Sequence, residues 1–139
     1  MRESKFQIFI DGASRGNPGR AALGIRILSS LQNSRTLKEV FEKLPDTTNN
    51  QAEYLALIRA FIEARNLGGT HLEIFSDSEL LVQQMNGIYR VRDENLKLLH
   101  RVANWLKEKF KNVSFKHISR GKNIRADFLA NKALDESVV

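Results

Sequence analysis

Four acidic residues lie where elements of secondary structure are predicted to begin or end, and they are the first candidates for chemistry. Asp11 and Asp77 each follow a short apolar strand pattern. Glu53 lies in the first turns of a predicted long helix, and Asp127 lies near the start of the last one, each beside apolar residues at helical spacing. Carboxylates brought together repel unless protons or cations compensate, so a cluster indicates raised pKa values or a metal site. The alternative is that acids in a first helical turn serve the helix dipole or the cap.

The residue types available restrict which metal such a site would hold. The chain contains no cysteine and three histidines, which excludes disulfides and thiolate sites. A metal would rest on carboxylates, carbonyls, water or imidazole, and hard cations prefer oxygen ligands. One or two Mg²⁺ ions are therefore expected, with Mn²⁺ as a substitute.

The elements that must position these acids follow from the periodicity of apolar residues. Three successive strand patterns predict an antiparallel meander, and the pattern then changes to that of a helix rich in Ala, Leu, Ile and Glu. Strands that alternate with helices after a meander indicate a mixed sheet covered by helices. The predicted strands are 6–10, 21–28, 35–44, 71–75 and 113–117, with a turn at 29–34, and the predicted helices are 49–66, 78–85, 93–109 and one from about 123.

Composition favours one globular domain over residues 1–139, with 42% hydrophobic and 27% charged residues. The apolar runs are too short for a membrane span and the start MRESK lacks the apolar region of a signal peptide, so a cytoplasmic protein without a membrane partner is expected. The net charge of +6 favours an anionic partner such as nucleic acid, although an excess of lysine can also serve solubility. Between Lys107 and Arg125, Glu108 is the one acid among many basic residues.

Four longer strings together carry a resemblance to a known family. They are DGASRGNPG after a strand, TTNNQAEYLAL entering a helix, FSDSELLVQQMNG after a strand and HISRGKNIRADFLANKAL entering a helix. In this order they resemble the type 1 ribonuclease H family over nearly the whole chain. The resemblance implies an α/β ribonuclease H-like fold, with a five-stranded mixed sheet, the first three strands antiparallel, and helices on both faces. It also implies hydrolysis of the RNA strand of RNA/DNA hybrids, leaving 5′-phosphate and 3′-hydroxyl ends.

The resemblance assigns roles to the residues at matching positions. Asp11 would bridge two Mg²⁺ ions, with Glu53 and Asp77 on the leaving-group side and Asp127 on the nucleophile side. Asn17, Asn50 and Gln83 are candidates for minor-groove contacts, and Thr48 and Ser78 for phosphate contacts. Each also has a structural alternative, as a cap, a turn residue or a helix surface residue. The implied substrate-binding set is Gly12, Ala13, Ser14, Arg15, Gly16, Asn17, Thr48, Asn49, Asn50, Ser78 and Gln83.

The chain departs from many bacterial members at two places. The segment HISRGKNIRAD is short and lacks the flexible-loop histidine before the last acid, as in archaeal-type members. The role of that histidine is not transferred to His117, and Arg120 is the candidate cation for the scissile phosphate or product release. In place of a basic protrusion, the segment 87–94 keeps only Arg90 and Arg92, which predicts weaker hybrid binding or greater dependence on other basic residues. Trp105 is predicted to be core or partly exposed packing.

Three other interpretations remain open from the sequence. A second enzyme class is a related nuclease of the same superfamily that acts on DNA, although the asparagines and the glycine-rich stretch favour RNA. A non-enzymatic nucleic-acid-binding protein is less consistent with four retained acids. The domain could also belong to a longer chain. The expected partners are an RNA/DNA hybrid and, as a second substrate, double-stranded RNA, with the chain acting as a monomer.

Overall fold

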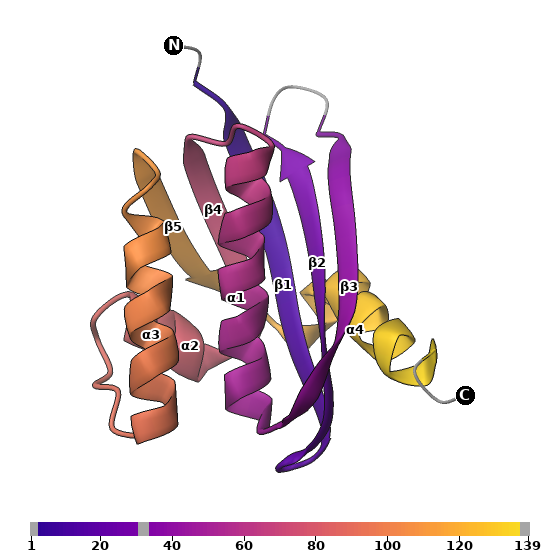
Figure 1. Ribbon diagram of the computed structural model, residues 1–139. Helices are drawn as coiled ribbons and strands as arrows, with labels where there is room; N and C mark the ends of the chain where they lie inside the picture. Colours follow the sequence, from indigo (N-terminus) through magenta and orange to yellow (C-terminus); the bar gives the residue numbers. More distant parts are fainter. Residues whose placement is uncertain (1–2, 31–33, 137–139) are drawn as a thin grey trace.

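The computed structural model describes residues 3–30 and 34–136, which form a five-stranded sheet with helices on both faces (Figure 1). The strand order is β3-β2-β1-β4-β5; β1, β2 and β3 pair antiparallel, whereas β4 is parallel to both β1 and β5. The elements are β1 Lys5–Gly16, β2 Gly19–Ser29, β3 Thr36–Thr47, α1 Asn49–Asn66, β4 His71–Ser76, α2 Glu79–Met85, α3 Glu94–Lys107, β5 Asn112–His117, the 3-10 turn η1 Arg120–Lys122 and α4 Ile124–Glu136. The predicted fold class is thereby confirmed. Part of the predicted turn at 29–34 lies outside the described residues.

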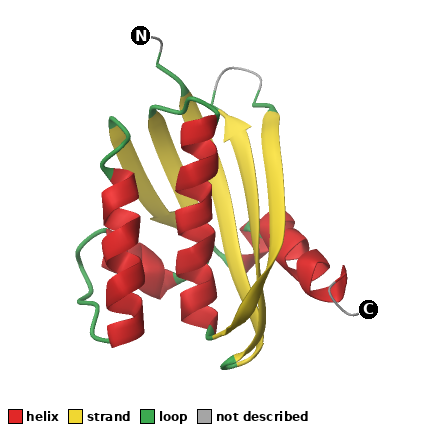
Figure 2. Ribbon diagram, in the orientation of Figure 1, coloured by secondary structure: helices red, strands yellow, loops and turns green. Residues whose placement is uncertain are grey.

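Alternation along the strands divides the side chains between two layers. Phe6, Ile8 and Ile10 of β1 lie in the core beneath α1, α2 and α3, together with Leu72 and Ile74 of β4. Helix α4 covers the opposite face, over β1, β2 and β3, as Figure 2 shows. This separation follows from the period of two in a strand, which sends successive side chains to opposite faces.

Helix α4 lies very close to the sheet because β2 carries a glycine beneath it. A Cβ atom added to Gly24 would lie 2.2 Å from the carbonyl oxygen of Ala126 and 2.6 Å from the backbone nitrogen of Ala130. Only a residue without a side chain permits this approach. Since Gly24 pairs with Asp11 across the β1–β2 ladder, the close packing brings the start of α4 to the part of β1 that carries Asp11.

The glycine-rich stretch after Asp11, which lies between the predicted strands 6–10 and 21–28, belongs to the sheet. Strand β1 continues through Asp11 to Gly16, and its pairing with β2 runs without interruption from Phe6↔Ser29 to Gly16↔Gly19. The turn is reduced to Asn17 and Pro18. The prediction that Asp11 follows a strand is therefore wrong. Pairing with β2 satisfies the backbone hydrogen bonds of this polar, glycine-rich sequence, and its composition alone does not reveal that tertiary pairing.

The cationic C-terminal third is divided between the two ends of the sheet. The amide of Lys111 donates to the carbonyl of Thr70, at the start of β4, 2.9 Å away. Lys107 and Lys109 lie near Lys111, whereas Arg120 follows the opposite ends of β4 and β5.

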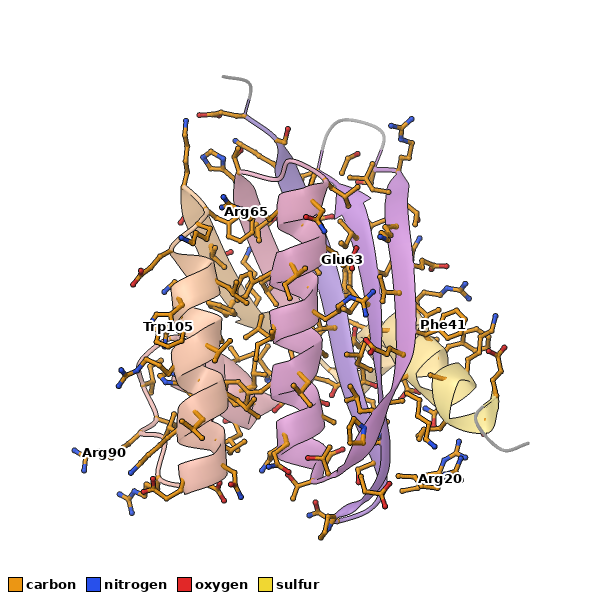
Figure 3. All side chains as sticks on the ribbon, in the orientation of Figure 1. Arg20, Phe41, Glu63, Arg65, Arg90 and Trp105 are labelled. Atoms are coloured by element: carbon orange, nitrogen blue, oxygen red, sulfur yellow. The ribbon has the colours of Figure 1, made fainter. Side chains whose placement is uncertain are left out.

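Trp105 lies on the outer side of α3 and is 58% exposed (Figure 3). The sequence predicted either a core position or partly exposed packing for this residue, and the structure shows the exposed one. Within residues 3–30 and 34–136, no helix is both long and apolar enough to cross a membrane.

Candidate active site

Asp11 and Asp77 lie side by side because β1 and β4 are parallel neighbours. The last pair of the β1–β4 ladder is Ile10↔Ser76. Asp11 directly follows Ile10, and Asp77 directly follows Ser76. Parallel strands present equivalent positions at the same edge of the sheet. Sheet register therefore places two carboxylates together that are far apart in the sequence.

Glu53 reaches the same place through close packing of α1 on β1. The backbone amide of Gly12 donates a hydrogen bond of 3.0 Å to Glu53 Oε1. A Cβ atom at Gly12 would lie 2.3 Å from the carbonyl carbon of Ala52, so the absence of a side chain at this position is required by the helix. Gly12 was predicted to belong to the substrate-binding set, and in the structure its amide holds a carboxylate.

Together these three acids form a cluster whose ligand atoms all lie within 4.8 Å of one another. Asp11 and Glu53 are buried and Asp77 is half-buried. Burial, reinforced by the charge of Asp77, raises the pKa of Asp11 to about 7. Burial and the charge of Asp11 likewise raise the pKa of Glu53 well above its usual range. The cluster is therefore electrostatically unfavourable when fully ionised, and a cation would relieve it.

The fourth acid, Asp127, lies in the first turn of α4 next to this cluster. Its carboxylate contributes to the raised pKa of Asp11, which places it beside that residue, although it is not one of the three acids within 4.8 Å. Asn131 orients it, since its Nδ2 donates to the backbone carbonyl of Asp127 at 3.0 Å and to Oδ1 at 3.3 Å. The structure thus brings all four predicted acids to one region, with three of them in close contact.

A groove of about 450 Å³ opens at the cluster, and Arg120, the basic residue predicted to assist the reaction, lines it. Its walls include Glu53 and Asp77, and Arg120 contributes from the 3-10 turn after β5. His117, which was not predicted to replace the flexible-loop histidine, also lines the groove. The remaining lining residues are Asn49, Ser78, Ile118 and Ser119.

A second, smaller groove of about 230 Å³ lies between the β1–β2 turn and the starts of α1 and α3. The predicted contacts Asn17, Thr48 and Asn50 line it, and Asn17 Oδ1 accepts a 3.0 Å hydrogen bond from the amide of Asn49. Asn95 of α3 also lines this groove. It was missed because an asparagine in a first helical turn is an ordinary surface residue, and no local pattern relates it to Asn17.

The other predicted substrate contacts are distributed over both faces of the sheet. Arg15 pairs with Asp135 of α4 at 2.7 Å, and Ala13 packs against the cluster beneath α4, so these two face away from α1. Ser14 Oγ donates to the carbonyl of Thr47 at 3.1 Å, and Gly16 ends β1 with a positive φ of 111°.

Two of the predicted phosphate-binding residues cap helices, which the sequence offered as the alternative for Thr48 but not for Ser78. Thr48 Oγ1 accepts from the amide of Gln51 at the start of α1, and Ser78 Oγ accepts from the amide of Leu81 at the start of α2. Gln83 lies half-buried on α2. The structure therefore gives Thr48 and Ser78 a structural contact, and their substrate contacts stay predictions.

Comparison with known proteins agrees with this arrangement. A family model described as reverse transcriptase-like matches residues 9–133. Ribonuclease HI of Halobacterium salinarum is 38% identical over 136 residues, covering 98% of this chain and 67% of that protein. LC11-RNase H1, isolated from compost by a metagenomic approach and solved in complex with an RNA/DNA hybrid, has a TM-score of 0.90 at 40% identity and covers 96% of this chain and 99% of its own.

A longer relative shows the same domain as part of a larger protein. A bifunctional protein of Mycobacterium tuberculosis is 37% identical over 131 residues, which are 94% of this chain but 36% of that protein. This chain therefore spans about a third of the length of that relative. Since the family model and the Halobacterium enzyme match nearly the whole chain, and the sheet carries the predicted acids at one edge, this chain belongs to the type 1 ribonuclease H family.

Proposed function

We propose that this chain is an endoribonuclease that hydrolyses the RNA strand of RNA/DNA hybrids with two divalent cations, Mg²⁺ first and Mn²⁺ as a substitute. The observation that carries the proposal is the cluster of Asp11, Glu53 and Asp77, with ligand atoms within 4.8 Å. The relative LC11-RNase H1, solved with an RNA/DNA hybrid, supports the substrate class. The proposed products have 5′-phosphate and 3′-hydroxyl ends.

The residues present fit hard divalent cations. All the candidate ligands are carboxylate oxygens, which Mg²⁺ prefers. Glu53 Oε2 is buried and has no hydrogen-bond partner among residues 3–30 and 34–136, and a buried polar atom without a partner is unfavourable unless something binds it. Asp11, Glu53 and Asp77 would hold one cation, and Asp11 with Asp127 the second. When bound, two cations make water more acidic and stabilise the charge that develops on the departing oxygen.

The chain's own residues would position the substrate around this centre. Asn49 and Ser78 line the groove beside Glu53 and Asp77 and offer polar groups to a phosphate backbone. The smaller groove, with its amide side chains from Asn17 and Asn50, suits hydrogen bonds to base edges and 2′-hydroxyls. Because the 2′-hydroxyl distinguishes RNA from DNA, the smaller groove is where selection of the RNA strand is expected.

Arg120 is expected to assist the reaction as a cation that faces the scissile phosphate. Replacing it by alanine should lower the single-turnover rate about tenfold, less than the loss of a buried donor, because the residue is exposed. Metal binding should be preserved, since Arg120 is not a ligand. The measurement is single-turnover cleavage of labelled hybrid together with Mn²⁺ titration.

The matched control for Arg120 is Lys122→Ala, a basic residue of the same 3-10 turn that lines a different groove on the α4 side. Its cleavage rate should remain that of the wild type. A wild-type rate in Arg120→Ala would remove this residue from the reaction. A loss seen only in His117→Ala would assign the assistance to the histidine instead.

The experiment that tests the proposed function compares three labelled duplexes. RNA/DNA hybrid, double-stranded RNA and duplex DNA are each incubated with Mg²⁺, Mn²⁺ or a chelator. The hybrid should be cut within its RNA strand, double-stranded RNA more slowly, and the chelated reaction should give no product. Extension of the fragments by a polymerase reports the 3′-hydroxyl. Cleavage of duplex DNA alone, or an intact hybrid with metal, would overturn the proposal.

A further inference from the structure

We propose that Asn123 is a positioning residue that sets the orientation of the Asp77 carboxylate for cation binding. The inference rests on the proposed function, because it assigns Asp77 to a metal. Asn123 lies between the 3-10 turn that carries Arg120 and the helix that carries Asp127. The sequence indicated only the start of a helix at this position.

The side chain of Asn123 crosses to the end of the sheet. It is 1% exposed, and its Nδ2 donates to the carbonyl oxygen of Ile10 at 2.8 Å and to Asp77 Oδ2 at 3.1 Å. One amide group thus joins the residue before Asp11 to the carboxylate of Asp77. Both contacts lie at the edge where β1 and β4 end their pairing.

The chemistry of these two partners requires an NH₂ group. A backbone carbonyl and an ionised carboxylate are both acceptors, and a side-chain amide has two N–H donors to serve them. An aspartate in this position would direct oxygen atoms at two other oxygen atoms. Alanine would leave the Ile10 carbonyl and one Asp77 oxygen without this donor.

A capping role does not explain the side chain. A capping asparagine accepts a hydrogen bond from a helix amide through its oxygen, but Asn123 Oδ1 is buried and has no hydrogen-bond partner in the described part of the chain. The first turn of α4 is instead closed by the backbone, where the Asp127 amide donates to the Asn123 carbonyl at 3.1 Å. Among the residues that the structure describes, the side chain of Asn123 forms hydrogen bonds with Ile10 and Asp77.

Fixing one oxygen of Asp77 leaves the other for a cation. Partners that hydrogen-bond a ligating carboxylate commonly change metal affinity or activity by about 10- to 100-fold when removed. Asn123 also anchors the segment between Arg120 and Asp127 to the sheet. Its loss is therefore expected to weaken cation binding at Asp77 more than it weakens binding of the hybrid.

The test compares Asn123→Ala with Asn86→Ala in the whole chain. Asn86 is a matched control because its Nδ2 also donates to a backbone carbonyl, that of Phe115 at 3.3 Å, away from the carboxylates. Mn²⁺ binding is measured by calorimetry and by electron paramagnetic resonance, and cleavage is measured as a function of Mg²⁺ concentration. Thermal unfolding and hybrid binding in chelator are measured alongside.

Asn123→Ala should raise the Mn²⁺ dissociation constant and the half-saturating Mg²⁺ concentration by about 10- to 100-fold. Added Mg²⁺ should recover much of the cleavage rate, hybrid binding should stay within about twofold of the wild type, and Asn86→Ala should change neither metal value. If Asn123→Ala does not fold, Asn123→Asp, which keeps the volume of the side chain, takes its place. Its Mn²⁺ dissociation constant should differ from that of the wild type.

Wild-type metal binding in a folded Asn123 variant would overturn the inference, as would an equal change in Asn86→Ala. Failure of the proposed function has a different signature. In that case the wild type would bind Mn²⁺ and respond to Asn123→Ala in calorimetry, yet would leave the hybrid intact.

Discussion

Replacing Asp77 by asparagine is expected to lower hybrid cleavage by at least about a thousandfold, since losing even a residue that supports a ligand commonly costs about 10- to 100-fold. Asparagine keeps the size of the side chain and an oxygen that can accept the hydrogen bond from Asn123 Nδ2, which is 3.1 Å long in the wild type. The fold should therefore persist while the negative charge that attracts a cation is lost. The measurement is single-turnover cleavage of labelled hybrid at saturating Mg²⁺.

The matched control for this variant lies on β4, the strand that Asp77 directly follows. Glu73→Gln also removes one carboxylate charge, but Glu73 pairs with Lys116 at 2.8 Å, away from the cluster. It should cleave the hybrid at the wild-type rate. If Asp77→Asn cuts as fast as Glu73→Gln, the carboxylate cluster is not the catalytic centre.

Replacing Asp11 by asparagine is expected to abolish cleavage and yet stabilise the metal-free fold. The pKa of Asp11 is raised from 3.8 to about 7 in the folded protein. Between these two pH values, Asp11 keeps its proton in the folded protein but has released it in the unfolded chain. This contribution to stability is complete below pH 3.8 and is lost as the pH rises to about 7. An uncharged asparagine avoids the loss, so above that pH the free energy of unfolding should rise by about 1–3 kcal/mol.

The measurement is denaturant unfolding in chelator across this pH range, followed by addition of Mg²⁺. The wild type should lose stability with rising pH and regain it with Mg²⁺, while Asp11→Asn should respond less to both. A variant less stable than the wild type at alkaline pH would show that repulsion in the cluster does not limit stability.

Glu63 provides a control for Asp11, because its pKa is shifted in the opposite direction. Glu63, labelled in Figure 3, is another buried acid of α1. Hydrogen bonds from Lys38 and Arg59 hold the pKa of Glu63 below its usual range. Its stabilisation is present above the unfolded pKa and is lost on acidification. Glu63→Gln should therefore destabilise the protein at neutral pH.

Local periodicity predicted the elements of this fold well. The helix predicted at 49–66 is α1 as observed, and the meander is β1, β2 and β3. Other boundaries moved by a few residues, as with the helix predicted at 93–109 that spans Glu94–Lys107. Such elements are accessible to sequence because apolar spacing and caps act between residues close in the chain.

The stretch from Asp11 to Gly19 was less accessible. Its Gly, Ser, Asn and Pro residues are typical of a loop, yet Asp11 to Gly16 pair with β2 over their whole length. Composition describes what a segment prefers in isolation, whereas pairing depends on a partner strand being available. The contact with α1 at Gly12 likewise follows from packing that no pattern within the stretch encodes.

By itself, the sequence determined the residue types available for the site: four candidate acids, no cysteine and a family resemblance in ordered strings. Tertiary structure decided which side chains meet. The Gly12 amide holds Glu53 across 41 residues, and the Asn123 amide joins Ile10 across 113. Strand register and helix packing create these contacts between residues distant in the chain, which is why local spacing indicated the acids but not the glycine and the asparagine that position them.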